Sequence, residues 1–309
     1  MKILLIIISF FFISIANAEI AVKLPKDTAS GFKILTKSLT GKYFKDYGVK
    51  VVKKKDGHPV RLGYKSLRFE VRSGDCGADK DRMWSDCKND RERHELSTGR
   101  SPDLMTNGEY WFSWSIYFPE DHINLYPLSN NYGQFHQTNG PPVFMFKERK
   151  YGYSIVRTIG DGDYDEKVIV RNKMMAGNWF DVLINVKWSK KDDGFFKLWV
   201  NDEQKYSYNG PTKTEKHVYQ KFGVYRTGIS RYLNYKNRKL IKKCLDEKDG
   251  TSEEVGAFYS LGRGYIEHDI SMQLFEKCKG YYQEMEVPTT IVYFDEVRKG
   301  RSKKSVSIK

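Results

Sequence analysis

Three short segments, far apart in the chain, carry side chains that could perform acid–base chemistry. They read Arg-His-Glu-Leu at 93–96, Gln-Phe-His-Gln at 134–137 and Tyr-Gln-Lys-Phe-Gly-Val-Tyr-Arg at 219–226. Alternate residues of a strand point to one face of a sheet, so each segment can present its polar side chains together. The set suits cleavage of an acidic sugar chain by β-elimination. That reaction needs a neutralised carboxylate, a base for a carbon-bound proton and an acid for the leaving oxygen.

Gln134 and Arg93 are the candidates for neutralising the carboxylate. The C5 proton of a 4-linked uronic acid can be removed only if the charge that builds up on the neighbouring carboxylate is stabilised. Gln134 can donate an amide N–H, and Arg93 can offer a planar, two-pronged donor set. Glu95 is placed to orient Arg93, and we expect Glu95, Lys221 and Arg226 to belong to the substrate-binding set. A purely structural ion pair between Arg93 and Glu95 is the alternative.

His136 and Tyr225 are the candidates for acid–base catalysis. An imidazole titrates with a pKa of about 6.5, whereas a phenol has a pKa of about 10 and needs a nearby cation to lose its proton. Lys221 falls on the same strand face as Tyr225 and could be that cation. Two routes stay open. Tyr225 can take the C5 proton and return it to O4, or His136 can take it while Tyr225 protonates O4.

The start of the chain has the pattern of a secretory signal peptide. Met1-Lys2 is followed by an apolar run over 3–15 and then by Ala16-Asn17-Ala18. A basic start, a short apolar stretch and a small-x-small ending predict cleavage after Ala18. The run is too short to span a bilayer comfortably, and no second apolar segment follows. The sequence therefore predicts removal of residues 1–18 and one domain over 19–309. It also predicts a secreted or periplasmic protein without membrane contact after cleavage.

Four cysteines allow three pairings, among which the sequence alone does not choose. The simplest expectation in an oxidising compartment is local pairing, Cys76 with Cys87 and Cys244 with Cys278. A zinc site is disfavoured because no CxxC pair or closely spaced Cys/His set is present. The sequence predicts no cofactor and no catalytic metal. Residues 160–163, Gly-Asp-Gly-Asp, resemble a fragment of a calcium loop but are interpreted as a turn, and a structural calcium ion is left open.

The charge of the chain favours an acidic partner. Lys and Arg number 53 against 39 Asp and Glu, which gives a formal net charge of +14. Such a surface raises the encounter rate with polyanions. Nucleic acid is the usual first suspicion for a basic protein. An exported protein with disulfides meets acidic polysaccharide instead, so we expect an acidic polysaccharide partner, no nucleic acid and a monomer.

Strict alternation of apolar and polar residues is the dominant pattern along the chain. It is clear over 67–72, 110–118, 182–188 and 196–200, and a β-rich run covers 289–297. Asp192-Asp193-Gly194 between two of these runs predicts a hairpin. Long helical periodicity is absent, and 230–286 is the least clear stretch, open to loops, short helices or a lid. These patterns predict an all-β fold, an antiparallel two-sheet sandwich of the jelly-roll, concanavalin-like type.

The order and wording of the segments resemble the jelly-roll polysaccharide lyases, which include alginate, glucuronan and heparin lyases. The resemblance covers the chain from about residue 60 onward. It rests on Arg-x-Glu-Leu at 93–96, Tyr-Trp-Phe-Ser-Trp-Ser-Ile-Tyr-Phe-Pro at 110–119, Gln-x-His at 134–136, Gly-Asn-Trp at 177–179, Tyr-x-Lys-x-Gly-x-Tyr at 219–225 and Tyr-Phe-Asp-Glu-Val at 293–297. The resemblance implies that Gln134 and Arg93 neutralise the carboxylate while His136 and Tyr225 exchange protons. Alginate lyases of this type often carry a second arginine where this chain has Ser97, which argues against alginate as the substrate.

Two other classes use the same sandwich. Carbohydrate-binding modules and lectins hold sugars without cutting them, so a lectin-like module for acidic polysaccharides is the main alternative. A retaining glycoside hydrolase would need two carboxylates about 5 Å apart, commonly from alternating acidic residues on one strand. The chain has no Glu-x-Asp-x-Glu run, so hydrolysis ranks below elimination.

Overall fold

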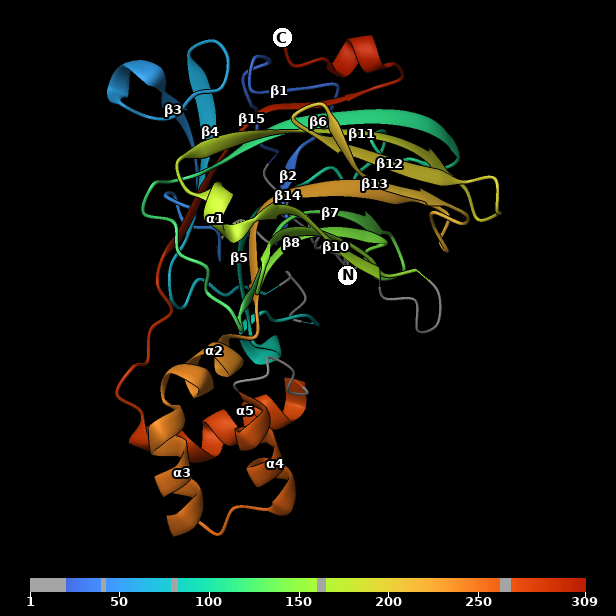
Figure 1. The fold of residues 1–309 in the computed structure, drawn as a ribbon. Coiled ribbons are helices and arrows are strands. Elements are labelled where there is room, and N and C mark those ends of the chain that lie inside the picture. The colour runs from blue at the N-terminus through green and yellow to red at the C-terminus, as the bar shows by residue number, and fades with distance from the viewer. Residues whose placement is uncertain (1–20, 40–42, 79–82, 160–164, 262–267) are drawn as a thin grey trace, which may run out of the picture.

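The computed structural model describes residues 21–39, 43–78, 83–159, 165–261 and 268–309. The predicted signal segment at 1–18 and the predicted turn at 160–163 lie outside these ranges. Within them, the strands form two stacked sheets, and a group of helices lies beyond one end of the stack (Figure 1). No helix in the described ranges is long and apolar enough to cross a membrane.

One layer, which we call the cleft sheet, has seven strands and carries all three segments singled out above. Its spatial order is β10 (Asp165–Arg171), β9 (Gly152–Arg157), β8 (Phe144–Arg149), β7 (Ser129–Gln137), β14 (Val218–Thr227), β5 (Arg91–Ser97) and β2 (Thr36–Lys37). Every pairing in this sheet is antiparallel.

The other layer, which we call the back sheet, has eight strands. Its spatial order is β13 (Glu203–Asn209), β12 (Phe195–Val200), β11 (Asn178–Trp188), β6 (Gly108–Phe118), β15 (Thr290–Gly300), β4 (Lys65–Val71) and β3 (Val49–Lys53), with β1 (Ala29–Ser30) parallel to β15. The short helix α1 (Asn172–Met175) joins β10 to β11. The predicted antiparallel two-sheet sandwich is confirmed.

The alternation read from the sequence sets which face of each strand is buried. In the hairpin of β11 and β12, Val182, Ile184 and Val186 lie opposite Val200, Leu198 and Phe196, and all six side chains are buried. The predicted turn at 192–194 lies between these two strands. Burial of one face while the other stays polar is the usual behaviour of a strand in a sandwich.

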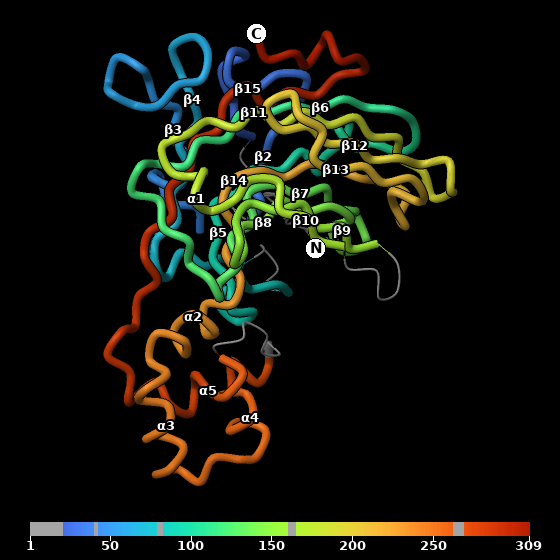
Figure 2. Tube along the Cα trace, in the orientation of Figure 1, coloured from blue at the N-terminus to red at the C-terminus, as the bar shows by residue number. Residues whose placement is uncertain are grey.

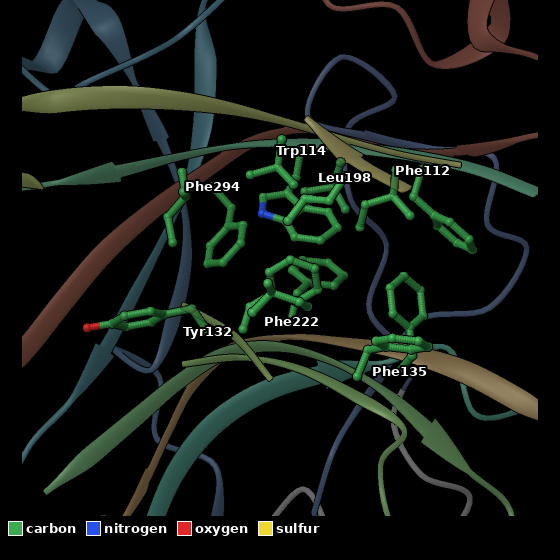
Figure 3. Packing of buried hydrophobic residues seen from close by; sticks show 14 of the residues in the cluster. Phe112, Trp114, Tyr132, Phe135, Leu198, Phe222 and Phe294 are labelled. Atoms are coloured by element: carbon green, nitrogen blue, oxygen red, sulfur yellow. The ribbon is translucent and has the colours of Figure 1, made fainter. Parts of the chain in front are cut away.

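Aromatic side chains fill the space between the two sheets. Figure 3 shows Phe112 and Trp114 of the back sheet facing Phe135 and Phe222 of the cleft sheet. The ring centroids of Phe112 and Phe135 are 4.9 Å apart in an edge-to-face arrangement, the geometry that aromatic pairs prefer. This packed interior supports the cleft sheet from behind, so its outer face can hold polar side chains in fixed positions.

Between β14 and β15, the described residues form four α-helices: α2 (Ile229–Lys236), α3 (Arg238–Glu247), α4 (Ser252–Ser260) and α5 (His268–Cys278). Figure 2 follows the chain from β14 through these helices and back to the upper layer at β15. We call residues 229–281 the helical insertion. It has its own apolar cluster around Ile241, Leu245 and Leu274. A second cluster, which includes Leu128 and Leu233, packs α2 against the segment before β7. Short helices with few apolar residues each leave a weak periodic signal, which explains why the sequence left this stretch open.

All four cysteines are paired, in the local pattern that the sequence favoured. Cys76–Cys87 closes a loop that leads into β5, and Cys244–Cys278 joins α3 to α5. The first disulfide lies at the edge of the candidate site, whereas the second holds the helical insertion together.

Candidate active site

The register of the cleft sheet brings the three segments side by side, because β14 pairs with β5 on one edge and with β7 on the other. Tyr225 lies opposite Arg93 of β5, and Lys221 lies opposite Gln134 of β7. Their side chains therefore share one face of the sheet and line a single cleft with a volume of about 740 Å³. Five of the residues singled out from the sequence line this cleft: Arg93, Gln134, His136, Lys221 and Tyr225.

Strand β14 has a β-bulge directly before Tyr225. Between Phe222 and Tyr225, β14 carries one residue more than the facing part of β7. Gly223 has a φ of +136°, and a Cβ there would lie 2.6 Å from the backbone oxygen of His94. Only glycine adopts this conformation readily. The glycine of the Tyr-x-Lys-x-Gly-x-Tyr segment is therefore a geometric requirement of the bulge.

Glu95 is the centre of a hydrogen-bond network beneath the cleft. Its Oε1 accepts a 2.6 Å bond from Gln134 Nε2, and its Oε2 accepts a 2.9 Å bond from Ser38 Oγ. Lys221 Nζ lies 3.7 Å from Oε2. The Glu95 side chain is only 1% exposed and does not line the cleft. The expectation that Glu95 binds substrate is therefore corrected, since this carboxylate positions Gln134 and Lys221 from below.

Arg93 is held chiefly by Asp86, a residue that the sequence analysis did not single out. The Nε and Nη2 atoms of Arg93 donate to the two Asp86 oxygens at 2.7 and 2.6 Å, whereas Nη1 lies 3.4 Å from Glu95 Oε2. Burial disfavours the charge of Arg93, yet its pKa is raised because Tyr225, Asp86 and Glu95 surround it. The two-pronged donor set expected for the substrate is already occupied by Asp86. Arg93 can contribute its charge and the remaining N–H groups on Nη1 and Nη2.

Tyr225 is contacted by two arginines. Arg91 Nη1 donates to its hydroxyl oxygen at 2.7 Å, and the Arg93 guanidinium carbon lies 3.9 Å from its ring centroid. Burial raises the pKa of Tyr225, and the two arginines only partly oppose this effect. Tyr225 is therefore a neutral phenol at neutral pH. The contacting cations are Arg91 and Arg93, rather than the Lys221 that alternation suggested.

His136 lies at the other end of the cleft, opposite Tyr219. Its Nδ1 is 2.7 Å from the backbone oxygen of Gln137 and 3.2 Å from the Tyr219 hydroxyl. A carbonyl oxygen only accepts, so the bond to Gln137 requires the proton on Nδ1 and leaves Nε2 with a lone pair. Burial and the nearby Lys221 ammonium lower the pKa of His136 to about 4. The imidazole is therefore neutral at neutral pH.

Arg226 does not belong to the site. It follows Tyr225 directly, so it points to the opposite face of β14, where its side chain is fully buried. There it forms an ion pair with Glu92 and donates a 2.6 Å bond to the backbone oxygen of Pro288. The structure thus places Arg226 away from the cleft, where it joins β14 and β5 to the segment before β15, and the expectation that it binds substrate has no support from this placement.

Among the cleft residues that sequence analysis did not single out are three that carry a charge or a phenol next to the site: Arg91, Lys147 and Tyr219. Arg91 could have been found, because it lies two residues before Arg93 and alternation places both on one face. Tyr219 is two residues before Lys221 and follows the same rule. Lys147 comes from β8, outside the three segments, and no local pattern marks it. As for metals, no group of three or more His, Cys, Asp or Glu side chains in the described ranges could hold an ion.

A family model described as polysaccharide lyase matches residues 42–250, more than half of the 309-residue chain. Among solved structures, an endo-β-1,4-glucuronan lyase from the fungus Trichoderma reesei matches with 15% identity and a TM-score of 0.50. That match covers 91% of this chain and 96% of the other. A family 7 alginate lyase in complex with substrate matches with 12% identity and a TM-score of 0.43, covering 84% and 83%. An alginate lyase from an Alteromonas species matches with 11% identity and a TM-score of 0.40, covering 82% and 94%. A sequence search of curated proteins finds no significant match.

Proposed function

Since the chain belongs to the polysaccharide lyase family, we propose that it cleaves a 4-linked polysaccharide containing uronic acid by β-elimination. Membership of the family makes it a lyase that acts on a polysaccharide; the acidic substrate and the roles of individual residues are our proposal. The observation that carries the proposal is one cleft with a neutral imidazole at one end and a protonated phenol at the other. A carboxamide and an ammonium lie between them.

The charges around the cleft support an acidic substrate. Arg91, Arg93 and Lys221 line it, whereas the carboxylates Asp86 and Glu95 are buried beneath and engaged by arginine, glutamine and serine. The formal net charge of the whole chain, +14, also attracts anionic polymers at long range. The fungal structure with the same fold is named as a glucuronan lyase, and glucuronan is a polymer of uronic acid.

The first chemical task is to stabilise the substrate carboxylate as the C5 proton leaves. Gln134 has a second amide N–H beyond the one that Glu95 accepts, and Lys221 lies opposite it on the neighbouring strand. Arg93, which also lines the cleft, adds a positive charge. Donors fixed before the reaction stabilise developing negative charge without reorganising, which is the main source of such electrostatic catalysis.

The second task is proton transfer. His136 Nε2 takes the C5 proton, and the electron pair of that bond forms the C4=C5 double bond as the C4–O bond breaks. Tyr225 gives its proton to the departing O4. The neutral state of His136 and the protonated state of Tyr225 at neutral pH support these roles. His136 and Tyr225 are separate groups that pair at different rows of β14 and β7, and a route with separate base and acid suits a substrate whose C5 proton and C4 oxygen are on opposite faces of the sugar ring.

The alternative route uses Tyr225 for both steps and suits a sugar whose C5 proton and C4 oxygen lie on the same face. It would need the phenol to lose its proton first, and burial opposes this. The two routes differ in what they require of His136. In the first, His136→Ala removes the base; in the second, it removes only a neighbour of the carboxylate.

The test is the appearance of ultraviolet absorbance from a conjugated unsaturated uronate when the protein meets glucuronan, alginate, heparan-type chains or pectate. Tyr225→Phe should lower the rate by about 10²–10⁴-fold, because general acid catalysis is lost while the ring still packs. Tyr64→Phe removes the same oxygen from a residue that is 79% exposed and outside the cleft, so it should be silent. A folded Tyr225→Phe protein with full activity would remove this residue from the chemistry.

A non-catalytic, lectin-like role is the competing outcome of the same experiment. A protein that binds these polymers tightly but never produces an unsaturated end would be a binding module. Hydrolysis would also give new ends without absorbance, and a reducing-sugar assay distinguishes it from binding.

Polysaccharide lyases generally act outside the cell, and we propose that this chain is exported with removal of residues 1–18. The basic, apolar and small-residue pattern of that segment supports export, as do the two disulfides. The mass of the protein collected outside the cytoplasm tests this, since it should begin at residue 19. A retained segment would contradict it.

A further inference from the structure

The cleft extends past Tyr225 toward the helical insertion, where it is lined by residues that the reaction does not use. We propose that Lys147, together with Arg91, forms a second anion subsite, which binds a carboxylate or sulfate on a sugar residue next to the one that is cleaved. This inference rests on the proposed function and adds the substrate class, a polymer with anionic groups on neighbouring residues.

The strand register fixes where Lys147 lies. Asn131 of β7 pairs with Tyr225 on one side and with Lys147 of β8 on the other. Lys147 is thus in the same cross-strand row as Tyr225, two strands away, or roughly 10 Å between backbones at the usual strand spacing. Both side chains line the cleft, and Arg231 of α2 lines it at the same end.

The subsite is separate from the carboxylate that Gln134 and Lys221 are proposed to neutralise. Gln134 pairs with Met145, and Lys147 lies two residues further along β8. One strand spacing and two residue rises put Lys147 roughly 8 Å from Gln134 between backbones. The two residues therefore occupy different positions along the cleft, and we assign the anion at Lys147 to a sugar next to the one that Gln134 and Lys221 hold.

The surroundings of Lys147 are short of negative charge. In the described ranges, no hydrogen bond or ion pair involves its ammonium group, and Arg91 has no carboxylate partner. The adjacent Glu148 faces the interior, where His122, Asn130 and Tyr132 bind its carboxylate. The carboxylates described near the cleft thus either face the interior of the sandwich or already accept hydrogen bonds from neighbouring side chains.

The electrostatics of Lys147 favour an anionic ligand. Burial, followed by the charges of Arg149, Arg91 and Arg231, lowers its pKa to about 8, and Glu166 only partly opposes this. A buried ammonium among like charges is unfavourable unless an opposite charge pairs with it. A bound carboxylate or sulfate would supply that charge, and binding should raise the pKa of Lys147.

The test uses Lys147→Gln, which removes the charge but keeps a polar side chain of similar reach. Its control is Lys55→Gln, the same change of charge at an exposed residue near β3 of the back sheet. Binding is measured by calorimetry in a Tyr225→Phe background, so that cleavage does not interfere. The three ligands are a uronate homopolymer, an unsulfated chain that alternates uronate with neutral sugar, and the sulfated form of that alternating chain.

We expect Lys147→Gln to raise the Kd of the homopolymer by about 10-fold or more, the usual cost of losing a charge-assisted contact. Its salt dependence should also become weaker. The unsulfated alternating chain should bind as before. A loss confined to the homopolymer identifies the anion as a neighbouring carboxylate, and a loss for the sulfated chain identifies it as sulfate.

The inference would be overturned if Lys147→Gln bound both the homopolymer and the sulfated chain as tightly as before. An equal loss of affinity for all three ligands would also overturn it, and so would the same loss in Lys55→Gln. These results are independent of the proposed reaction. A wild-type protein that forms no unsaturated product would reject the elimination, while the binding comparison would still decide whether the second subsite exists.

Discussion

Replacing Asp86 by Asn should destabilise the fold through the arginine that it holds. The side chains of Asp86 and Arg93 are 0% and 7% exposed, and two short hydrogen bonds join them. Removing one partner of a buried ion pair leaves an uncompensated charge and typically lowers the free energy of unfolding by about 3–5 kcal/mol. Asn keeps one acceptor oxygen, and Glu95 lies 3.4 Å from the guanidinium, so we expect the lower figure.

Urea unfolding followed by fluorescence would measure this loss, and a drop of about 3 kcal/mol corresponds to a Tm lower by about 5 °C in a chain of this size. Asp192→Asn, in the exposed turn between β11 and β12, is the matched control. Adding Arg93→Met to Asp86→Asn should restore part of the stability, because the unpaired charge is gone. The reasoning is refuted if Asp86→Asn costs less than about 1 kcal/mol, or if the double variant loses the sum of both single changes.

Three further changes test other parts of the site. Gly223→Ala should lower both stability and kcat/KM, because a Cβ at a φ of +136° meets the neighbouring strand; normal activity at an unchanged Tm would disprove the role of the bulge. As the pH falls, kcat/KM should drop near pH 4, because the pKa of His136 is lowered to about 4 and the imidazole is a neutral base above that pH. A drop near pH 6.5, the pKa of an unperturbed histidine being about 6.5, would contradict this. Arg226→Met should reduce the free energy of unfolding by about 3–5 kcal/mol by leaving Glu92 unpaired. It should leave the activity of the folded fraction intact, and a selective loss of kcat would return Arg226 to the site.

The sandwich could be predicted from the sequence because its signals are local. The runs that became β6, β11 and β12 alternate apolar and polar residues, and that pattern alone fixes which face is buried. The helical insertion has no comparable signal. Its helices depend on one another and on Cys244–Cys278, so their stability comes from tertiary contacts that a sequence pattern does not display.

The residues of the candidate site likewise include some that local patterns predict and others that only tertiary contacts bring into place. Gln134, His136, Lys221 and Tyr225 share a face for reasons of strand geometry, and their convergence in one cleft follows from β7 and β14 being neighbours. Arg226 was expected to bind substrate although it differs from Tyr225 by one position. The same parity could have excluded it.

The partners of the site residues were not predictable, because they come from the loop before β5 and from other strands. Asp86 reaches Arg93 through a loop, and Lys147 reaches the cleft from β8. Loop conformation and the order of strands in a sheet are tertiary features, and neither leaves a periodic trace in the sequence.

The disulfide Cys76–Cys87 has a consequence for when the enzyme becomes competent. Asp86 is the residue next to Cys87, so the disulfide that closes this loop also positions the carboxylate that accepts hydrogen bonds from Arg93. A chain with open thiols has more conformational freedom in the loop and therefore a weaker hold on Arg93. We expect full electrostatic assembly of the cleft only after oxidation. For a chain exported as proposed above, the cleft would then be fully assembled only in an oxidising compartment, and the newly made chain would be less active before export.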